Sequence, residues 1–242
     1  MRPLPLIVLI AMCSCRSEDK PKDALDEARQ LAERGNYAEA LQKHIWFHDH
    51  ALESNPGMYG VRLSFALSAW VELGEKYPKA LEALKEIRDK KTARLDGGEA
   101  NRDLFHDVVA INEHLGQSPA TVTLFKQIEA RQPEFANSIF DLVDEALVEA
   151  GEYQLARNYL GDPADRLAIA RRNYEEGLQF AETRSRNAAA SRQAFENIFT
   201  EKALRLIVIL DKTGDRTAAR QIQSDVLKVL DNAKLRNALA PP

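Results

Sequence analysis

The chain has 242 residues, of which 45% are hydrophobic and 29% are charged, and its formal net charge is −4. This balance excludes the clearly basic domain that is the footprint of nucleic-acid binding, so we expect no nucleic-acid partner. Only 11 glycines and 10 prolines are present. Because an all-β fold needs a turn about every 8–12 residues, this sparse punctuation predicts long helices instead.

The first fifteen residues form an apolar leader that ends in cysteine. Arg2 precedes an apolar run over residues 4–12, and the only two cysteines of the chain, Cys13 and Cys15, follow directly. Nine apolar residues in a helix measure about 14 Å, roughly half the hydrocarbon core of a bilayer, so the run predicts a secretory signal rather than a membrane span. The composition then turns abruptly polar, which indicates a tether.

An apolar run that ends in a small residue and a cysteine resembles the lipobox of bacterial lipoproteins. The resemblance implies that Cys15, which follows the small Ser14, is the acylated N-terminus of the mature protein, and that Cys13 is the poorer candidate. Two or three acyl chains would anchor the protein durably in a membrane. Arg16 stands where many lipoproteins carry the acidic residue of inner-membrane retention, which favours the periplasmic side of the outer membrane. The alternative is a plain secretory signal with two incidental cysteines.

Five later segments share one layout: an apolar-periodic helix, a glycine, a short turn and a second helix with a small residue near its start. Their glycines are Gly35, Gly74, Gly116, Gly151 and Gly214. A glycine just past a helix end can adopt the left-handed conformation that closes the last carbonyls. An aromatic residue two or three positions later can pack over the turn, and a small residue five or six positions later lets two helices approach to about 8–10 Å. The layout therefore predicts repeated helix hairpins.

The Gly-x-Tyr-x-x-Ala pattern, intact at Gly35 and Gly151, resembles the core of the tetratricopeptide repeat. It has a one-residue insertion after Gly74 and is weaker at Gly116 and Gly214. The resemblance implies an all-α solenoid of antiparallel helix pairs. The glycine spacings of 39, 42, 35 and 63 residues depart from the family period of about 34, so the repeats are degenerate. A non-repeat helical bundle is the alternative.

We expect a signal peptide over residues 1–14, a polar tether over 15–22, a repeat domain over 23–236 and a frayed tail over 237–242. The predicted units of the repeat domain are 23–56, 58–95, 100–133, 136–163, a divergent unit 164–199, and 200–231. In the divergent region the repeat pattern is lost, but two helical stripes of apolar residues remain. These stripes are Leu167, Ala170, Tyr174, Leu178 and Ala181, and then Phe195, Phe199, Ala203, Leu206 and Leu210.

In tetratricopeptide-repeat proteins a peptide or protein segment lies in a concave groove, against the first helix of each unit. Exposed groove positions fall about ten, six and three residues before the turn glycine. Carried over to this chain, the resemblance implies a partner-binding groove lined by Arg29, Ser64, Ser68, His106, Glu113, Asp141 and Glu145. The acidic residues toward its middle favour a basic or polar partner.

One cluster of histidines merits attention as a metal site. His44 and His48 stand four residues apart and share a helix face, a spacing that two zinc ligands use. The adjacent glutamate of His-Glu-x-x-His and a third ligand are missing, so we interpret both as edge residues of a helix that buries Trp46 and Phe47. We expect no metal and no cofactor.

The sequence favours binding over catalysis. It contains no nucleophile elbow, dinucleotide fingerprint or Walker phosphate loop. We therefore expect a membrane-anchored scaffold of the cell envelope that binds a protein or peptide partner, and not an enzyme. Two alternatives stay open: a lipoprotein that binds a small molecule, peptide or glycan, and a metal-dependent enzyme that uses His44 and His48. The sequence indicates neither the partner's identity nor the oligomeric state.

Overall fold

A computed structural model describes residues 21–239 of the chain. All regular secondary structure in this range is helical, which confirms the all-α prediction. The chain divides into two compact units, residues 1–86 and residues 87–242, and the division falls within one helix, α5 (Pro78–Asp96).

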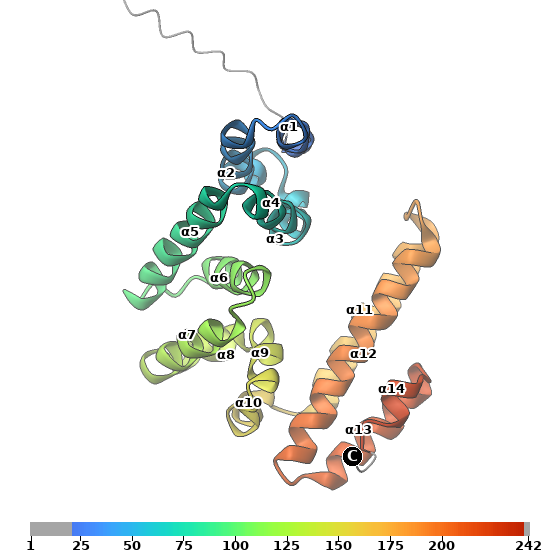
Figure 1. Ribbon diagram of the computed structural model, residues 1–242. Coiled ribbons are helices and arrows are strands. Elements are labelled where there is room, and N and C mark those ends of the chain that lie inside the picture. Colours follow the sequence, from blue (N-terminus) through green and yellow to red (C-terminus); the bar gives the residue numbers. More distant parts are fainter. Residues whose placement is uncertain (1–20, 240–242) are drawn as a thin grey trace, which may run out of the picture. The chain divides into compact units, whose positions relative to one another are not determined.

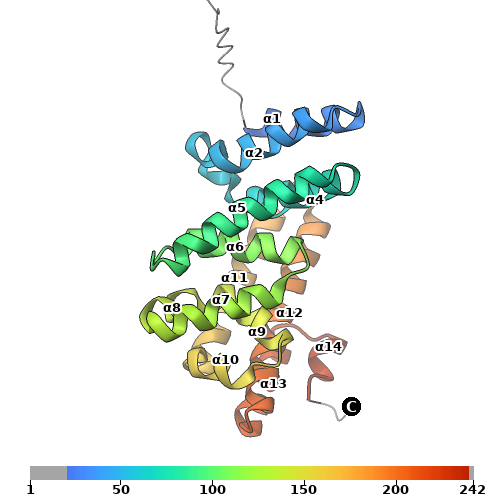
Figure 2. The same cartoon turned by 60° about the vertical axis from the view of Figure 1, so that its left-hand side comes forward.

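The described part of the first unit contains α1 to α4 and the beginning of α5. These elements are α1 (Pro21–Glu33), α2 (Tyr37–Ser54), the 3-10 turn η1 (Pro56–Met58), α3 (Tyr59–Leu63) and α4 (Phe65–Lys76). Figure 2 shows α1 and α2 packed along one another as a hairpin. Both helices also contact α4. A short interruption at Ser64 separates α3 from α4.

In the first unit, small side chains lie at the contact of α1 and α2, and large ones, among them Phe47, Leu67 and Trp70, are buried in the core. Ala24, Ala28 and Ala40 are fully buried where α1 and α2 meet. Trp70 of α4 is buried, and its indole Nε1 donates a hydrogen bond of 2.9 Å to the carbonyl oxygen of Ala80. The indole nitrogen thereby keeps a partner in the core, as a buried tryptophan requires.

The second unit contains the end of α5 and all later helices (Figure 1). They are α6 (Arg102–His114), α7 (Ser118–Arg131), α8 (Pro133–Ile139), η2 (Phe140–Leu142), α9 (Asp144–Glu149), α10 (Tyr153–Leu160), α11 (Pro163–Thr183), α12 (Ala188–Lys212), α13 (Arg216–Val229) and α14 (Ala233–Arg236). Its core is continuous and rich in large side chains. Phe105, Phe125, Ile139, Phe140 and Phe199 are all essentially inaccessible to solvent.

The same turn joins four of the helix pairs. Gly35, Gly116, Gly151 and Gly214 have φ values between +66° and +89°. At Gly35 the amide donates to the carbonyl of Ala32, and the next amide, of Asn36, donates to the carbonyl of Leu31; the other three turns repeat this pattern. This is the Schellman closure of a helix C-terminus. The residue after each glycine also precedes the next helix directly, so the predicted turn is confirmed at these four glycines.

Gly74 departs from the expected turn. It lies inside α4, two residues before the helix ends at Lys76, and its φ is not positive. A Cβ atom built at Gly74 would lie 2.3 Å from Cγ of Leu81, so the glycine serves close helix packing instead. Pro78 explains the shifted turn, because proline disfavours helical backbone in the residue before it, here Tyr77. Tyr77 stacks on Tyr37, with the ring centroids 6.2 Å apart.

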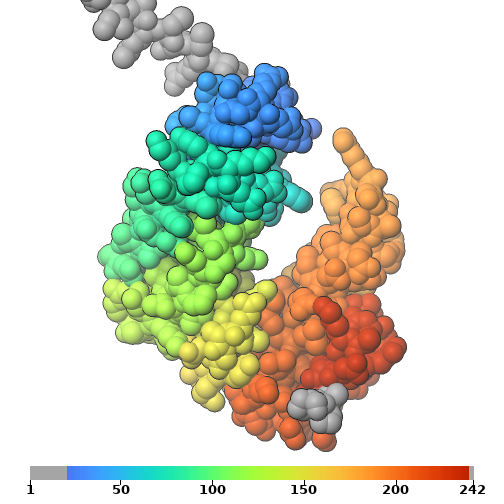
Figure 3. Space-filling view, viewed as in Figure 1, coloured from blue at the N-terminus to red at the C-terminus, as the bar shows by residue number. Residues whose placement is uncertain are grey.

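The predicted apolar stripes of the divergent region lie on α11 and α12, which pack side by side (Figure 1). Leu167, Ala170 and Tyr174 of the first stripe are buried, and Tyr174 stacks on Phe199 of the second at 5.0 Å. Figure 3 shows the end of this hairpin, in orange, standing clear of the red helices α13 and α14. The boundary expected between residues 199 and 200 falls inside α12, so one helix serves both of the predicted units.

Candidate binding cleft

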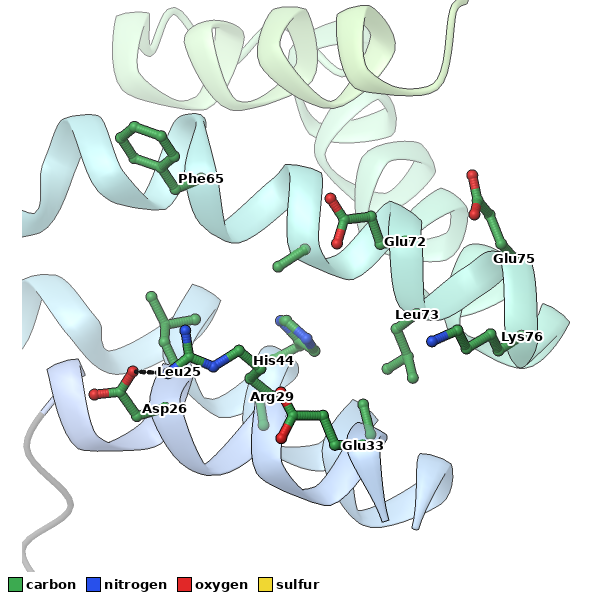
Figure 4. Close-up of a pocket in the computed structure, with 13 residues that line it drawn as sticks. Leu25, Asp26, Arg29, Glu33, His44, Phe65, Glu72, Leu73, Glu75 and Lys76 are labelled. Atoms are coloured by element: carbon green, nitrogen blue, oxygen red, sulfur yellow. Dashed lines mark hydrogen bonds and ion pairs between the residues drawn. The ribbon is translucent and has the colours of Figure 1, made fainter. Parts of the chain in front are cut away.

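A cleft of about 580 Å³ lies in the first unit between α1 and α4. Figure 4 shows its two walls, with His44 of α2 between them. Its apolar lining comes from residues three or four positions apart on each helix, which is the spacing of one helix face. These residues are Leu25, Ala28 and Ala32 on α1, and Phe65, Ala69 and Leu73 on α4.

The cleft exists because small side chains occur where two helices face each other. Ala28, Ala32 and Ala69 each end at Cβ, so none of them fills the space between the backbones of α1 and α4. At the mouth, the side chain of Phe65 is 76% exposed, although it is large and apolar. The result is an apolar cavity with an exposed aromatic ring at its edge.

His44 supplies a buried polar group to this cleft. The residue is only 4% exposed, its ring stacks on Trp70 at 5.6 Å, and its Nδ1 forms no hydrogen bond. Burial lowers the pKa of His44 to about 4. The imidazole is therefore neutral at pH 7, and it presents one donor and one acceptor nitrogen.

The second histidine of the predicted pair also lies in the core of this unit. His48 is buried, and its ring meets the edge of Trp70 at 6.1 Å. Its backbone carbonyl accepts a hydrogen bond of 2.8 Å from Nε of Arg62. Within residues 21–239 no group of three histidine, cysteine, aspartate or glutamate side chains is placed to hold a metal ion. Both rings are buried and pack against Trp70, so the expectation that the two histidines lie at the edges of their helix is wrong.

Charged side chains surround the cleft. Four of those that line it are acidic and two are basic, namely Asp26, Glu33, Glu72 and Glu75, against Arg29 and Lys76. Arg29 and Asp26 form an ion pair at 3.2 Å, visible in Figure 4. The three glutamates are exposed and have no ion-pair partner among residues 21–239. The rim therefore carries excess negative charge that the first unit does not neutralise.

The structure places the predicted groove residues of the first unit at or beside this cleft. Arg29 lines it. Ser64 and Ser68 are exposed but do not line it; on α4 the lining residues are Phe65 and Ala69, one position later in each case. The Ser64 hydroxyl instead donates a 2.7 Å hydrogen bond to the carbonyl of Gly60 at the interruption before α4.

The predicted groove residues of the second unit lie on α6, η2 and α9. Glu113 and Glu145 come together at a smaller cleft, of about 120 Å³, between α6 and α9. His106 is half-buried, and this burial lowers its pKa.

Two of the three acidic groove residues of the second unit, Asp141 and Glu145, are paired within the chain. Asp141 accepts two hydrogen bonds, of 2.9 and 2.8 Å, from the guanidinium of Arg102. Glu145 accepts one of 2.6 Å from Arg205. Their charges are thus already offset, and they form a weaker attraction for a basic partner than the sequence suggested.

Sequence reasoning missed Glu33, Glu72 and Glu75 as rim residues and Phe65 as an exposed aromatic residue. A signal for the cleft was nonetheless present. Ala28 and Ala32 form a small-residue stripe at helical spacing, and such a stripe on one of two facing helices indicates either a close approach or an open space.

The predicted lipid-attachment residue, Cys15, lies outside the described residues. Among the described helices, none combines the length and the apolar character that crossing a bilayer requires. Comparison with known proteins adds no relative: no protein-family model, no curated protein and no solved structure matches the chain.

Proposed function

We propose that this protein is a binding scaffold built from degenerate, tetratricopeptide-like helix pairs, and that it holds a segment of a partner protein in the cleft between α1 and α4. The observation that carries the proposal is this cleft itself: an apolar cavity with an exposed aromatic residue and unneutralised glutamates. The four equivalent glycine turns support the repeat architecture. In repeat proteins, stacked helix pairs present concave faces of this kind to their partners.

We propose further that the scaffold acts at the cell envelope, anchored through lipid on Cys15, and that Arg16 directs it to the outer membrane. The support is the leader sequence and the polar residues 16–20 that lie between Cys15 and α1; the tether predicted over 15–22 overlaps the first two residues of α1. Six residues, 15–20, span at most about 22 Å when extended, so the first unit would work close to the membrane surface. Replacing Cys15→Ser should move the protein into the soluble fraction; unchanged membrane partitioning would overturn this part of the proposal.

The proposed role is binding without catalysis and without a cofactor. General acid–base catalysis relies on groups whose pKa lies near the working pH, and burial draws the pKa of His44 to about 4. The ring is also fixed against Trp70. Both features suit a packing and recognition role.

A small-molecule ligand is the second candidate, favoured by the dimensions of the cleft. Ligand sites in proteins are typically cavities of about 300–1,000 Å³, lined by apolar groups with a few polar ones, and this cleft has that size and a buried imidazole. A ligand that raises the unfolding temperature without any protein partner would favour this candidate.

To test the scaffold proposal, partners are recovered from native membranes with two full-length proteins. In the wild type the cleft is open, and in the variant a bulky side chain fills it. Ala69→Phe places a ring between α1 and α4, where Ala69 now leaves space. We expect a near-stoichiometric partner on the wild-type protein and its loss on the variant. Equal recovery with both proteins would show that the partner binds elsewhere. Recovery of no partner with either protein would favour the small-molecule candidate.

A further inference from the structure

The apolar part of the cleft indicates what kind of side chain it receives. Its lining alanines leave space between α1 and α4, and Phe65 stands exposed at the edge. An apolar side chain placed between the two helices would contact Ala32, Ala69 and Leu73 of the lining. A concave, mostly apolar cavity with a few polar groups is the usual form of a binding site.

The charge at the rim indicates what surrounds that side chain. Because Asp26 and Arg29 offset each other, three glutamates face one lysine, Lys76. Glu72 and Glu75 lie three residues apart on α4, and Glu33 lies on α1 at the opposite wall (Figure 4). Positive groups on both sides of an inserted apolar residue would therefore find acceptors. Charge complementarity of this sort steers association and selects between partners.

The floor of the cleft adds no open polar group. His44 lines the cavity but is only 4% exposed, and its Nδ1 is buried without a hydrogen bond, so an occupant would not reach this nitrogen. The apolar and charged side chains of the two walls therefore set the chemistry of the occupant.

We propose that the cleft between α1 and α4 binds a basic amphipathic polypeptide segment, in which an apolar residue inserted over Ala32 and Ala69 is flanked by lysine or arginine residues paired with Glu33, Glu72 and Glu75. This inference rests on the proposed function of the cleft and adds the chemical class of the partner.

The experiment is selection of a random twelve-residue peptide display library on the full-length protein, held in nanodiscs of zwitterionic phosphatidylcholine, followed by fluorescence anisotropy with synthetic versions of the selected peptides. We expect the selected sequences to combine a large apolar residue with flanking lysine or arginine. The double substitution Glu72→Lys with Glu75→Lys should weaken their binding about tenfold or more, and added salt should weaken binding to the wild type.

The matched control is Glu39→Lys with Glu82→Lys, which reverses two exposed glutamates on α2 and α5 away from the cleft. It should change the affinity by less than about twofold, since distant surface charges are largely screened. If the lysine variant does not fold, Glu72→Gln with Glu75→Gln removes the same charges with little change of shape. A loss of about threefold or more is then expected.

Selection of neutral or acidic sequences, selection of no sequence, or unchanged affinity in the Glu72 and Glu75 variants would overturn the inference. So would a dimer of the chain that occupies the cleft and dissociates in those variants. These failures are distinguishable from failure of the scaffold proposal. A native partner lost with Ala69→Phe but retained with Glu72→Lys and Glu75→Lys would leave the cleft as the binding site and reject the basic segment.

Discussion

Each unit has a cleft between the first helices of two consecutive helix pairs, and the cleft of the first unit is the larger one. In the first unit, the cleft lies between α1 and α4 and measures about 580 Å³; in the second, the one between α6 and α9 measures about 120 Å³. Ala69 and Ala146 stand five residues before Gly74 and Gly151, respectively, and both line their clefts.

The difference comes from the opposite wall. Seven and three residues before the turn glycine, α1 has Ala28 and Ala32, whereas α6 has Val109 and Glu113. Val109 and Glu113 both line the smaller cleft of the second unit. Larger side chains on one wall thus accompany the smaller cleft, and on this ground we propose the binding function for the first unit.

The largest expected effect concerns the residue that supports the open cleft. Trp70→Ala removes a fully buried indole and its hydrogen bond to Ala80, and should destabilise the first unit by about 3–5 kcal/mol. Hydrogen exchange should show faster exchange in α1, α2 and α4. Trp46→Ala, at a half-buried site, is the control and should cost clearly less. Equal costs would mean that Trp70 does not organise this unit.

The next effect is a pH dependence carried by His44. Folding lowers its pKa from 6.5 to about 4, so the folded state resists a proton that the unfolded chain accepts. The contribution of His44 to the free energy of unfolding is fully present above pH 6.5. It is lost as the pH falls toward 4, and the total loss is about 3 kcal/mol.

Denaturation followed by Trp70 fluorescence, in a Trp46→Phe background, at pH 7 and pH 4.5 measures this loss. Carboxyl groups also titrate in this range, so His44→Gln provides the reference. It should retain a smaller pH dependence than the parent protein. The same slope in both proteins would contradict the buried, neutral imidazole.

A smaller effect tests the turn that both units share. Gly116→Ala puts a Cβ on a backbone with φ of +66° and should cost about 1–2 kcal/mol. Gly116→Asn should cost less, since asparagine tolerates this conformation. Unfolding by urea gives both values. A cost for alanine no larger than that for asparagine would show that the left-handed turn is not required.

The smallest effect concerns the charges of the second unit. Arg102→Ala breaks a two-bond pair with Asp141, but both side chains are nearly half exposed, so the loss of stability should be at most about 1 kcal/mol. The loss of stability caused by Arg102→Ala should also decrease with added salt. A loss above about 2 kcal/mol would imply that this pair, rather than the apolar core, holds α6 to the segment that contains Asp141.

The fold was predictable wherever the determinant was local. A glycine that ends a helix closes the same hydrogen bonds at the four predicted turns and also at Gly98, because the closure depends only on the residues around it. At Gly74 the repeat pattern misled, although Pro78 carried the information that the helix continues to Lys76. The extent of α12 across the expected unit boundary had no local signal, because helical periodicity continues through it.

The candidate site was only partly predictable. Arg29 was placed at the cleft by its distance from Gly35, but Ser64 and Ser68 missed the lining by one residue. The interruption of the helix at Ser64 determines which residues of α4 face the cleft. This interruption depends on the folded structure and has no signal in the local sequence. The free volume itself could not be foreseen, since it depends on two alanine-bearing helix faces meeting. The pairing of Asp141 and Glu145 with arginines 39 and 60 residues away depends on tertiary structure in the same way.

The most direct test of the central claim exploits the equivalent alanines. Ala69→Phe and Ala146→Phe each place the same ring in one of the two clefts, in otherwise identical full-length protein. The quantity measured is the amount of the native partner recovered per mole of protein from mildly solubilised membranes. The account predicts at least a tenfold loss for Ala69→Phe and full recovery for Ala146→Phe, whereas full recovery for Ala69→Phe or loss only for Ala146→Phe would contradict it.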